Sequence, residues 1–296
     1  MPIISRPAWI AAFLVLFGLI AMLSHFSGTT LDYSRYNPEW NGTSRFFEMI
    51  GEQDAVTITR FEDLPSHGDA LLLMPAPEDE YREDEIAHLV EFLEGGNILV
   101  LVSDREDENQ ITSALGSDIR IQHANLTSID RYFDHPSSVI AFPAGDDPIS
   151  AGIPHIVLNR PSYLLGGVPV FESSLLSWVD ADGDSRLGSE ETLQRYTVIA
   201  RDSVGEGTLY VIADPSIFIN GMLVAGPGDG NARLADNIIT ARPFLIVDQG
   251  HSRTAYAPEM IRVVNLFKES TITKMALITV IFLAASLLVI PWRRKS

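Results

Sequence analysis

The twelve residues from Asp180 to Glu191 hold a set of possible metal ligands. They read DADGDSRLGSEE, with acids at positions 1, 3, 5 and 12, which are Asp180, Asp182, Asp184 and Glu191. Closely spaced carboxylates repel one another unless a hard divalent cation neutralises them. This spacing is typical of the calcium-binding loop of an EF-hand. The pattern therefore predicts a calcium site.

Two departures from that pattern keep a second interpretation open. Position six of the run is Ser185, where the sharp turn of an EF-hand loop uses glycine. The flanking segments 174–179 and 194–200 have the composition of strands, whereas an EF-hand loop joins two helices. The alternative is an acidic turn between two strands that binds no ion.

Polar side chains capable of acid–base chemistry follow two further apolar segments. Asp214 comes directly after the segment 209–213. Asp248 and His251 come directly after the segment 244–247. Polar residues at the carboxyl ends of strands line the ligand crevice of open α/β sheets, and an Asp and a His brought together can transfer protons. Asp214, Asp248 and His251 are therefore the candidate catalytic residues.

Structural roles are the alternative for these same residues. Asp214 or Ser216 can cap the turn that follows its strand, and an Asp–His hydrogen bond can simply hold a loop in place. The sequence contains no G-x-S-x-G nucleophile elbow and no H-E-x-x-H zinc motif. Cysteine is absent, which excludes disulfides, cysteine-ligated metals and cysteine nucleophiles.

The apolar pattern that must position these residues predicts an α/β fold. Continuous apolar runs such as 70–74 and 98–102 suit strands that are buried on both faces of a parallel sheet. Between them, apolar residues of 80–94 recur with helical spacing, and Gly95–Gly96 ends the helix. Further strands are expected at 56–59, 139–142, 156–158, 196–200, 209–213 and 244–247, and further helices at 232–240 and 260–268. We expect a mostly parallel sheet flanked by helices, with a β-rich insertion or subdomain within residues 143–195.

The charge of the chain is strongly negative. Its 296 residues include 39 Asp and Glu against 21 Lys and Arg, a formal net charge of −18. Neither residues 1–27 nor residues 271–296 contain an acid, so the acidity belongs to the central part. Such a surface repels nucleic acid and attracts cations or basic partners. We expect no nucleic-acid partner.

Two apolar segments predict membrane-spanning helices. Residues 8–26 lack Asp, Glu, Lys and Arg, and at about 1.5 Å per residue they reach roughly 28 Å, close to the thickness of the hydrocarbon core. Residues 275–292 form the second segment. Arg6 and the basic residues 293–295 place both termini in the cytoplasm by the positive-inside rule. The alternative for the first segment is a cleaved signal peptide. We expect a two-pass cell-membrane protein whose central domain is extracytoplasmic.

These boundaries divide the chain into three parts. They are an N-terminal anchor over residues 1–27, an α/β domain over residues 28–270, and a C-terminal transmembrane helix with a basic tail over residues 271–296. Two sequons, at Asn41 and Asn125, predict N-glycans on an extracytoplasmic domain. For Asn41 and the glycine after it, the alternative is a plain turn.

Several motifs resemble the family called domain of unknown function 4350. They are SRYNPEWNGTS at 34–44, SWVD at 177–180, GTLYVIADPSIFING at 207–221 and DQGH at 248–251. The resemblance implies a fold like that of class I glutamine amidotransferases, related to auxiliary domains of gliding-type transport systems. It also implies a membrane-anchored protein without an established activity. Because amidotransferases of that class need a cysteine nucleophile and this chain has none, the parent chemistry is absent and a binding role is favoured.

Two functions from different classes follow. The first is a membrane-anchored extracytoplasmic binding or scaffold module, an accessory to an envelope or transport system with protein partners in the cell envelope. The second is an acid–base or metal-assisted hydrolase or transferase that uses Asp214, Asp248 and His251. This second function requires the three side chains to converge around a pocket. Calcium is the one cofactor that the sequence suggests.

Overall fold

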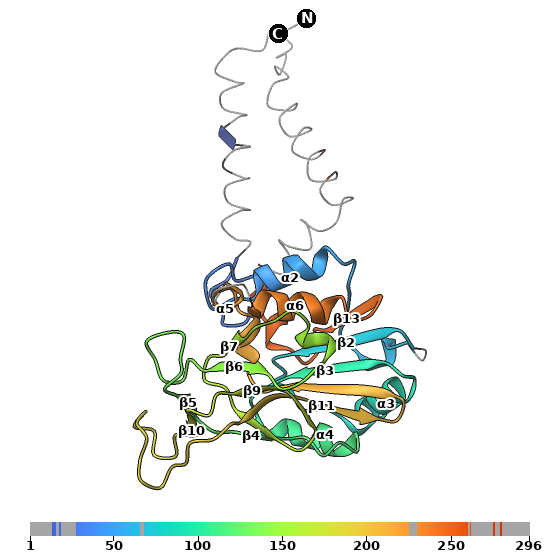
Figure 1. Cartoon of the computed structure of the whole chain (residues 1–296). Helices are drawn as coiled ribbons and strands as arrows, with labels where there is room; N and C mark the ends of the chain where they lie inside the picture. The colour runs from blue at the N-terminus through green and yellow to red at the C-terminus, as the bar shows by residue number, and fades with distance from the viewer. Residues whose placement is uncertain are drawn as a thin grey trace, which may run out of the picture. The chain divides into compact units, whose positions relative to one another are not determined.

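A mixed sheet organises the unit formed by residues Thr30–Tyr256 (Figure 1). The computed structural model describes residues 28–65, 68–224 and 230–259, with the single residues 14, 15, 18, 261, 275 and 279. Within these residues the strands are β1 (Val56–Ile58), β2 (Ala70–Pro75), β3 (Ile98–Val102), β4 (Arg120–Gln122), β5 (Leu126–Ser128), β6 (Ile140–Pro143), β7 (Ile156–Val157), β8 (Tyr163–Leu165), β9 (Val168–Ser173), β10 (Ser177–Val179), β11 (Thr197–Val204), β12 (Gly207–Ile212) and β13 (Phe244–Asp248).

Helices cover both faces of this sheet. They are α2 (Ser44–Gly51), α3 (Glu83–Glu94), α4 (Asn109–Ala114), α5 (Asn220–Leu223) and α6 (Gly230–Ile239), with 3-10 turns η1 (Phe61–Asp63), η2 (Glu106–Glu108), η3 (Pro148–Ser150), η4 (Pro215–Phe218) and η5 (Arg253–Ala255). The expected helices 80–94 and 232–240 correspond to α3 and α6. The expected helix 260–268 lies almost wholly outside the described residues.

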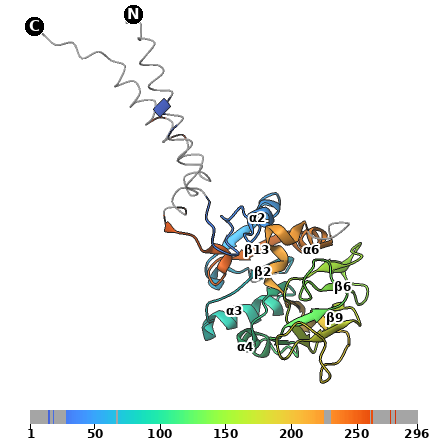
Figure 2. The same ribbon diagram turned by 90° about the vertical axis from the view of Figure 1, so that its left-hand side faces the viewer.

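The parallel half of the sheet runs in the order β1–β13–β2–β3–β12. Every residue of β2 and β3 is buried, because helices pack on both faces. Side chains alternate along each strand, so Leu71 and Leu73 join the core under α2 and α6, while Leu72 and Met74 join the core under α3 and α4. Figure 2 shows α3 and α4 together on their side of the sheet. The continuous apolar runs thus predict the parallel half correctly.

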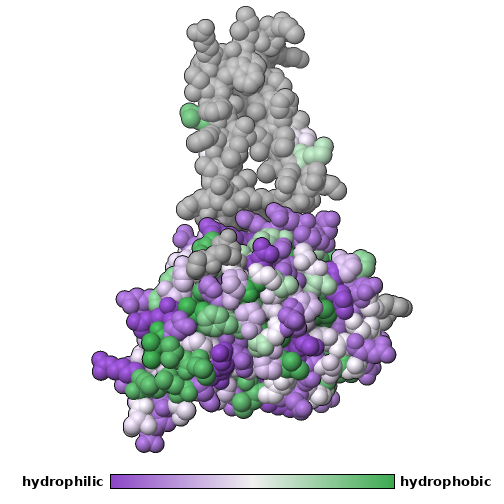
Figure 3. Space-filling view, in the orientation of Figure 1, coloured by the Kyte–Doolittle hydropathy of each residue, from purple (hydrophilic) through white to green (hydrophobic). Residues whose placement is uncertain are grey.

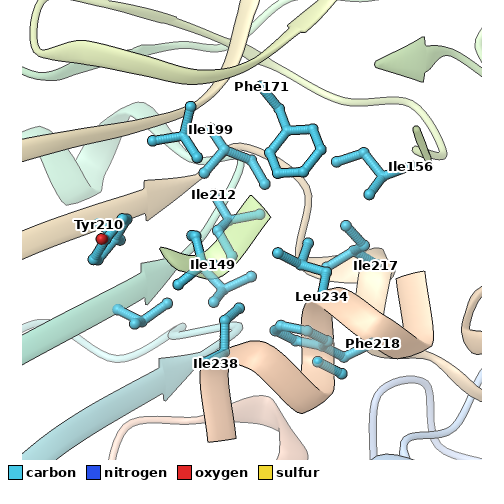
Figure 4. Close-up of a cluster of buried hydrophobic side chains, with 14 of the residues drawn as sticks. Ile149, Ile156, Phe171, Ile199, Tyr210, Ile212, Ile217, Phe218, Leu234 and Ile238 are labelled. Carbon is cyan, nitrogen blue, oxygen red and sulfur yellow. The ribbon is translucent and has the colours of Figure 1, made fainter. Parts of the chain in front are cut away.

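The core under α6 is built from side chains of the strands, of α6 and of the turn η4. Figure 4 shows Leu234 and Ile238 of α6 and Phe218 of η4 packing towards Ile212 of β12. Phe171 of β9 lies in the same cluster. The cluster therefore spans the parallel and antiparallel halves of the sheet and joins them in one core.

The prediction of a mostly parallel sheet is wrong for the second half. Beyond β12 the order is β11–β9–β6–β7, with β4 and β8 attached through β11, and every pair is antiparallel. A two-residue turn with Gly205 at φ 59° joins β11 to β12, and so short a link permits only antiparallel neighbours. Although β9 falls within the expected insertion 143–195, it lies inside the main sheet, and β10 pairs apart with β5.

The prediction of terminal membrane helices also needs correction. Most of residues 8–26 and 275–292 lies outside the described residues. Across the ranges that the structure describes, no helix combines the length and the apolar character that crossing a bilayer requires. The prediction rested on the apolar length of the two segments and on the basic residues that flank them, and both are criteria of composition. The fold class is therefore corrected to a mixed α/β domain. The two-pass cell-membrane location, the cytoplasmic termini and the extracytoplasmic placement are given up with the terminal helices.

The two ends of the unit Thr30–Tyr256 meet. The backbone N–H of Arg35 donates to the carbonyl of Thr254 at 2.8 Å. The guanidinium of Arg253 lies 4.5 Å from the centre of the Tyr33 ring, a cation–π contact. The chain therefore enters and leaves this unit at neighbouring points.

Candidate functional site

Asp248 and His251 form a closed turn at the end of β13. One carboxylate oxygen of Asp248 accepts hydrogen bonds from the N–H groups of Gly250, at 2.8 Å, and His251, at 3.4 Å. The other oxygen lies 3.2 Å from Nδ1 of His251. A Cβ at Gly250 would lie 2.4 Å from the carbonyl oxygen of Thr59, so this position requires glycine. The structure thus brings together two of the three candidate catalytic residues.

The imidazole of His251 is enclosed by protein groups. Its Nε2 lies 3.4 Å from a carboxylate oxygen of Glu85, and its ring stacks on Tyr81 at 4.6 Å and packs against Phe61 at 4.9 Å. Burial alone would lower the pKa of His251, but the carboxylates of Asp248 and Glu85 outweigh it and raise the pKa above its ordinary value. The arrangement stabilises an imidazolium ion held between two acids.

Asp214 caps the turn that follows β12. Its carboxylate accepts hydrogen bonds from the N–H of Ser216 at 2.8 Å, the hydroxyl of Ser216 at 2.6 Å and the N–H of Asn159 at 2.7 Å. Burial raises its pKa to about 6, although these hydrogen bonds favour the charged form. Strands β2 and β3 stand between β12 and β13. At about 4.8 Å per strand, Asp214 lies roughly 14 Å from Asp248. The structure does not bring Asp214 to the Asp248–His251 pair.

The acidic run 180–191 forms a loop between β10 and β11. Carboxylate oxygens of Asp180, Asp182 and Asp184 lie within 4.8 Å of one another. The buried Asp180 accepts from the N–H groups of Gly183 at 2.9 Å and Ser185 at 3.0 Å. Ser185 adopts φ 59°, a left-handed conformation at the position where an EF-hand loop uses glycine. Strands flank the loop, as the sequence predicts.

The fourth predicted ligand, Glu191, closes the loop through the backbone. One oxygen of its carboxylate accepts from the N–H of Ala181 at 2.9 Å, and the other accepts from the N–H of Gly188 at 2.8 Å.

The surface near β5 and β10 is apolar, as Figure 3 shows, and Ile129, Leu175 and Leu176 are exposed there. Such exposed apolar surface is typical of contact regions.

A pocket that the sequence analysis missed lies beside the carboxyl ends of β2 and β3. It has a volume of about 140 Å³ and is lined by residues of 78–81 and 105–111, with Ile86 of α3. Glu108 is 4% exposed, and its carboxyl group forms no hydrogen bond or ion pair with any described residue. Burial raises its pKa to about 7, and the nearby Arg105 offsets only part of this. Glu108 lies in the acidic run EDEN at 106–109, and nothing in this composition distinguishes a buried carboxyl group from exposed ones.

The motif residues near the N-terminus and after β12 lock two segments together. The side-chain amide of Asn220 donates to the carbonyls of Asn37 at 3.0 Å and Glu39 at 2.7 Å, and its oxygen accepts from the N–H of Arg45 at 2.9 Å. A Cβ at Gly42 would lie 1.9 Å from the carbonyl oxygen of Asn37. The motifs at 34–44 and 207–221, which contribute to the family resemblance, therefore stabilise the fold by contacting each other.

The two sequon residues differ in their surroundings. Asn41 bonds to Asn37, at 3.0 Å, and to Asp32, whereas Asn125 is exposed. N-glycosylation at either residue stays a prediction.

The comparisons with known proteins identify a family of unknown function. The family model described as "Domain of unknown function (DUF4350)" matches residues 35–239. No curated protein matches the sequence.

Several solved structures are similar at low identity. One titled "mmIFT52 N-terminal domain" has a TM-score of 0.44 and 15% identity, covering 58% of this chain and 75% of that one. The cytoplasmic protein STM1381 from Salmonella typhimurium LT2 has a TM-score of 0.42 and 9% identity, covering 68% of this chain and 87% of its own. The cytoplasmic protein STM3548 from Salmonella typhimurium has a TM-score of 0.40 at the same identity and coverage. All three TM-scores lie below 0.5, so we draw no conclusion about the function or location of this chain from these structures.

Proposed function

Because the chain belongs to the family of domains of unknown function DUF4350, we propose that it is a binding or scaffold module that works without amidotransferase chemistry. The observation that carries the proposal is the enclosure of His251. A general base needs a nitrogen within reach of the substrate proton. Both ring nitrogens of His251 face carboxylates instead, and the rings of Tyr81 and Phe61 pack against the imidazole.

The other polar strand end supports the same proposal. Both oxygens of Asp214 accept hydrogen bonds from the turn after β12 and from Asn159, so this carboxylate holds two segments in place. The hydrolase alternative needs Asp214 beside Asp248 and His251, and two strands separate them. The acidic surface and the exposed apolar residues near β5 and β10 are features of a protein that binds others.

Chemical modification of histidine tests this proposal. We expect diethylpyrocarbonate to modify His251 of the full chain at least tenfold more slowly than the exposed His135, because Nε2 of His251 is covered by Glu85. Mass spectrometry of the peptides gives both rates in one sample, so His135 serves as the internal control. Unfolding in urea should make the two rates equal. If His251 reacts as fast as His135 in the folded chain, its nitrogen is accessible and the proposal fails.

A second property, calcium binding by the loop 180–191, is favoured by the convergence of Asp180, Asp182 and Asp184. We propose that these carboxylates and Glu191 bind calcium. The left-handed Ser185 supports this, because it gives the loop the sharp turn that an EF-hand loop obtains from glycine. Glu191 would supply the late carboxylate of such a loop.

A thermal melt of the full chain tests the calcium proposal. A ligand that binds only the folded state stabilises it, by about 2.7 kcal/mol when its concentration is 100 times Kd. We therefore expect millimolar calcium to raise Tm, and EDTA to reverse the rise. The double variant Asp182→Asn/Asp184→Asn should lose the rise, while the exposed Asp118→Asn should keep it. An unchanged Tm of the original chain in millimolar calcium would leave this loop a plain acidic turn.

A further inference from the structure

The pocket beside Glu108 lies where an α/β sheet places its ligands. The segment 78–81 follows β2, and the segment 105–111 follows β3, so the pocket opens at the carboxyl ends of two neighbouring parallel strands. Crevices at this edge of a sheet are the common ligand sites of open α/β folds. None of the candidate residues named from the sequence lines this pocket.

Two polar groups of the pocket lack partners. The hydroxyl of Tyr81 is fully buried and has no hydrogen-bond partner. The carboxyl group of Glu108, on a side chain that is also buried, forms neither a hydrogen bond nor an ion pair within the described ranges. The hydroxyl of Tyr81 has no surface that an occupant of the cavity could touch. Buried polar groups are nearly always hydrogen-bonded, so the unpaired carboxyl group of Glu108, which lines the cavity, points to an occupant that bonds to it.

The charge of the lining selects a cation. Arg105 is the one basic residue among the lining residues, and its guanidinium is already engaged by the carbonyl of Glu78 at 3.0 Å and by Asp107 at 2.9 Å. Against it stand five acids, which are Glu78, Asp79, Glu80, Asp107 and Glu108. An occupant with N–H donors and a positive charge is complementary to this wall.

The shape of the pocket favours an ammonium group on an alkyl chain over a metal ion. Among the described residues, three acids with oxygens close enough to share an ion occur in the loop 180–184 and not here. Ile86 and Ile111 add apolar wall, which suits a methylene stem. The compact ammonium of lysine needs less room than the planar guanidinium of arginine, and the cavity measures only about 140 Å³.

We propose that this pocket binds the ammonium group of a lysine side chain from a protein partner, with the carboxylate of Glu108 as the hydrogen-bond acceptor. The inference rests on the proposed function, since it gives the binding module a ligand. The lysine stem packs against Ile86 and Ile111. The remaining acids of the wall attract a basic segment of the partner.

The proposed binding depends on pH. The pKa of Glu108 is raised to about 7, mainly by burial, and a cation binds the ionised carboxylate. The charged groups acting on Glu108 are Arg105, Asp107 and His251. Glu78, Asp79 and Glu80 complete the wall, and the phenol of Tyr81, whose pKa is raised by burial, stays neutral. The ionised fraction of Glu108 rises about tenfold from pH 6 to pH 8, so lysine affinity should rise by about the same factor.

Ligand titration observed by NMR tests the proposal on the full chain. The probe is Nα-acetyl-lysine methylamide, and its matched control is the norleucine analogue, which lacks the ammonium group. We expect saturable binding of the lysine compound at pH 8, weaker binding at pH 6 and no saturable binding of the norleucine compound. Glu108→Gln should weaken lysine binding at least tenfold, whereas Glu52→Gln, at an exposed position outside the pocket, should not change it.

The outcomes separate this inference from the proposed function. Equal binding of the two compounds, unchanged affinity in Glu108→Gln, or no lysine binding to the original chain would each overturn the lysine pocket and leave water as its occupant. If His251 at the same time stays protected from diethylpyrocarbonate, the binding-module proposal stands without this ligand. If His251 reacts rapidly, the proposed function itself fails, whatever the pocket binds.

Discussion

Replacing Asn220 by alanine is expected to lower the free energy of unfolding by about 4 kcal/mol. The Asn220 side chain forms hydrogen bonds to Asn37, Glu39, Ser44 and Arg45, and it is 3% exposed. Each hydrogen bond contributes about 1 kcal/mol, and alanine would also leave buried backbone groups unpaired. Because native domains are stable by roughly 5–15 kcal/mol, this loss is large. Urea unfolding followed by circular dichroism measures it.

The control for this prediction is an exposed asparagine. Asn125→Ala removes the same amide from the surface, where substitutions usually change stability by less than about 0.5 kcal/mol. A loss below about 1 kcal/mol in Asn220→Ala would show that the segment 34–44 does not depend on this side chain. If the urea concentration at the unfolding midpoint falls while the slope of the unfolding free energy against urea concentration stays the same, the variant exposes as much surface on unfolding as the original chain.

Replacing Glu108 by glutamine is expected to stabilise the protein, and more at pH 8 than at pH 5. Burial raises the pKa of Glu108 from 4.5 to about 7. Between these values the folded state keeps a proton that the unfolded state has lost, so stability falls as pH rises through this window and stays low above it. The full shift corresponds to about 3 kcal/mol. Glutamine does not ionise, so the variant escapes this fall.

Thermal melts at the two pH values measure the effect. At about 2–4 °C per kcal/mol for a domain of this size, the variant should melt roughly 6–12 °C above the original chain at pH 8 and by clearly less at pH 5. Asp214 also has a raised pKa, but it is present in both proteins, so its contribution to the pH dependence of stability is the same in each. A stabilisation of equal size at both pH values would contradict the protonated, buried state of Glu108.

The parallel half of the fold could be predicted because its strands carry their own signal. Runs such as 70–75 and 98–102 are apolar throughout, and a helix with clear periodicity joins them. In the antiparallel half, the expected strands 139–142, 156–158 and 196–200 correspond to β6, β7 and β11, but their antiparallel pairing and strand β9 were not predicted. Strand β9 contains Pro169 and follows Gly166–Gly167, residues that ordinarily break strands, so its segment resembles an insertion. Pairing with β11 and β6, which are distant in sequence, decides its place.

In the candidate site, too, contacts between residues close in sequence could be predicted and contacts between distant segments could not. The Asp248–His251 contact could be predicted because the two residues stand three positions apart in one turn. Glu85, which holds the other nitrogen of His251, comes from the first turn of α3, and no local pattern connects it to β13. The Tyr81–Glu108 pocket could not be found for the same reason. Its two segments meet only because β2 and β3 are neighbours in the sheet.

The bond between Arg35 and Thr254 determines how the unit responds to mechanical load. Because the chain enters and leaves at neighbouring points, tension on the two ends acts first on this contact and on the stacking of Arg253 over Tyr33. We expect these contacts to separate before the parallel strands behind them bear the load. The same geometry allows the unit to be inserted into a surface loop of a host protein, because the two ends of that loop need to be separated by only a short distance.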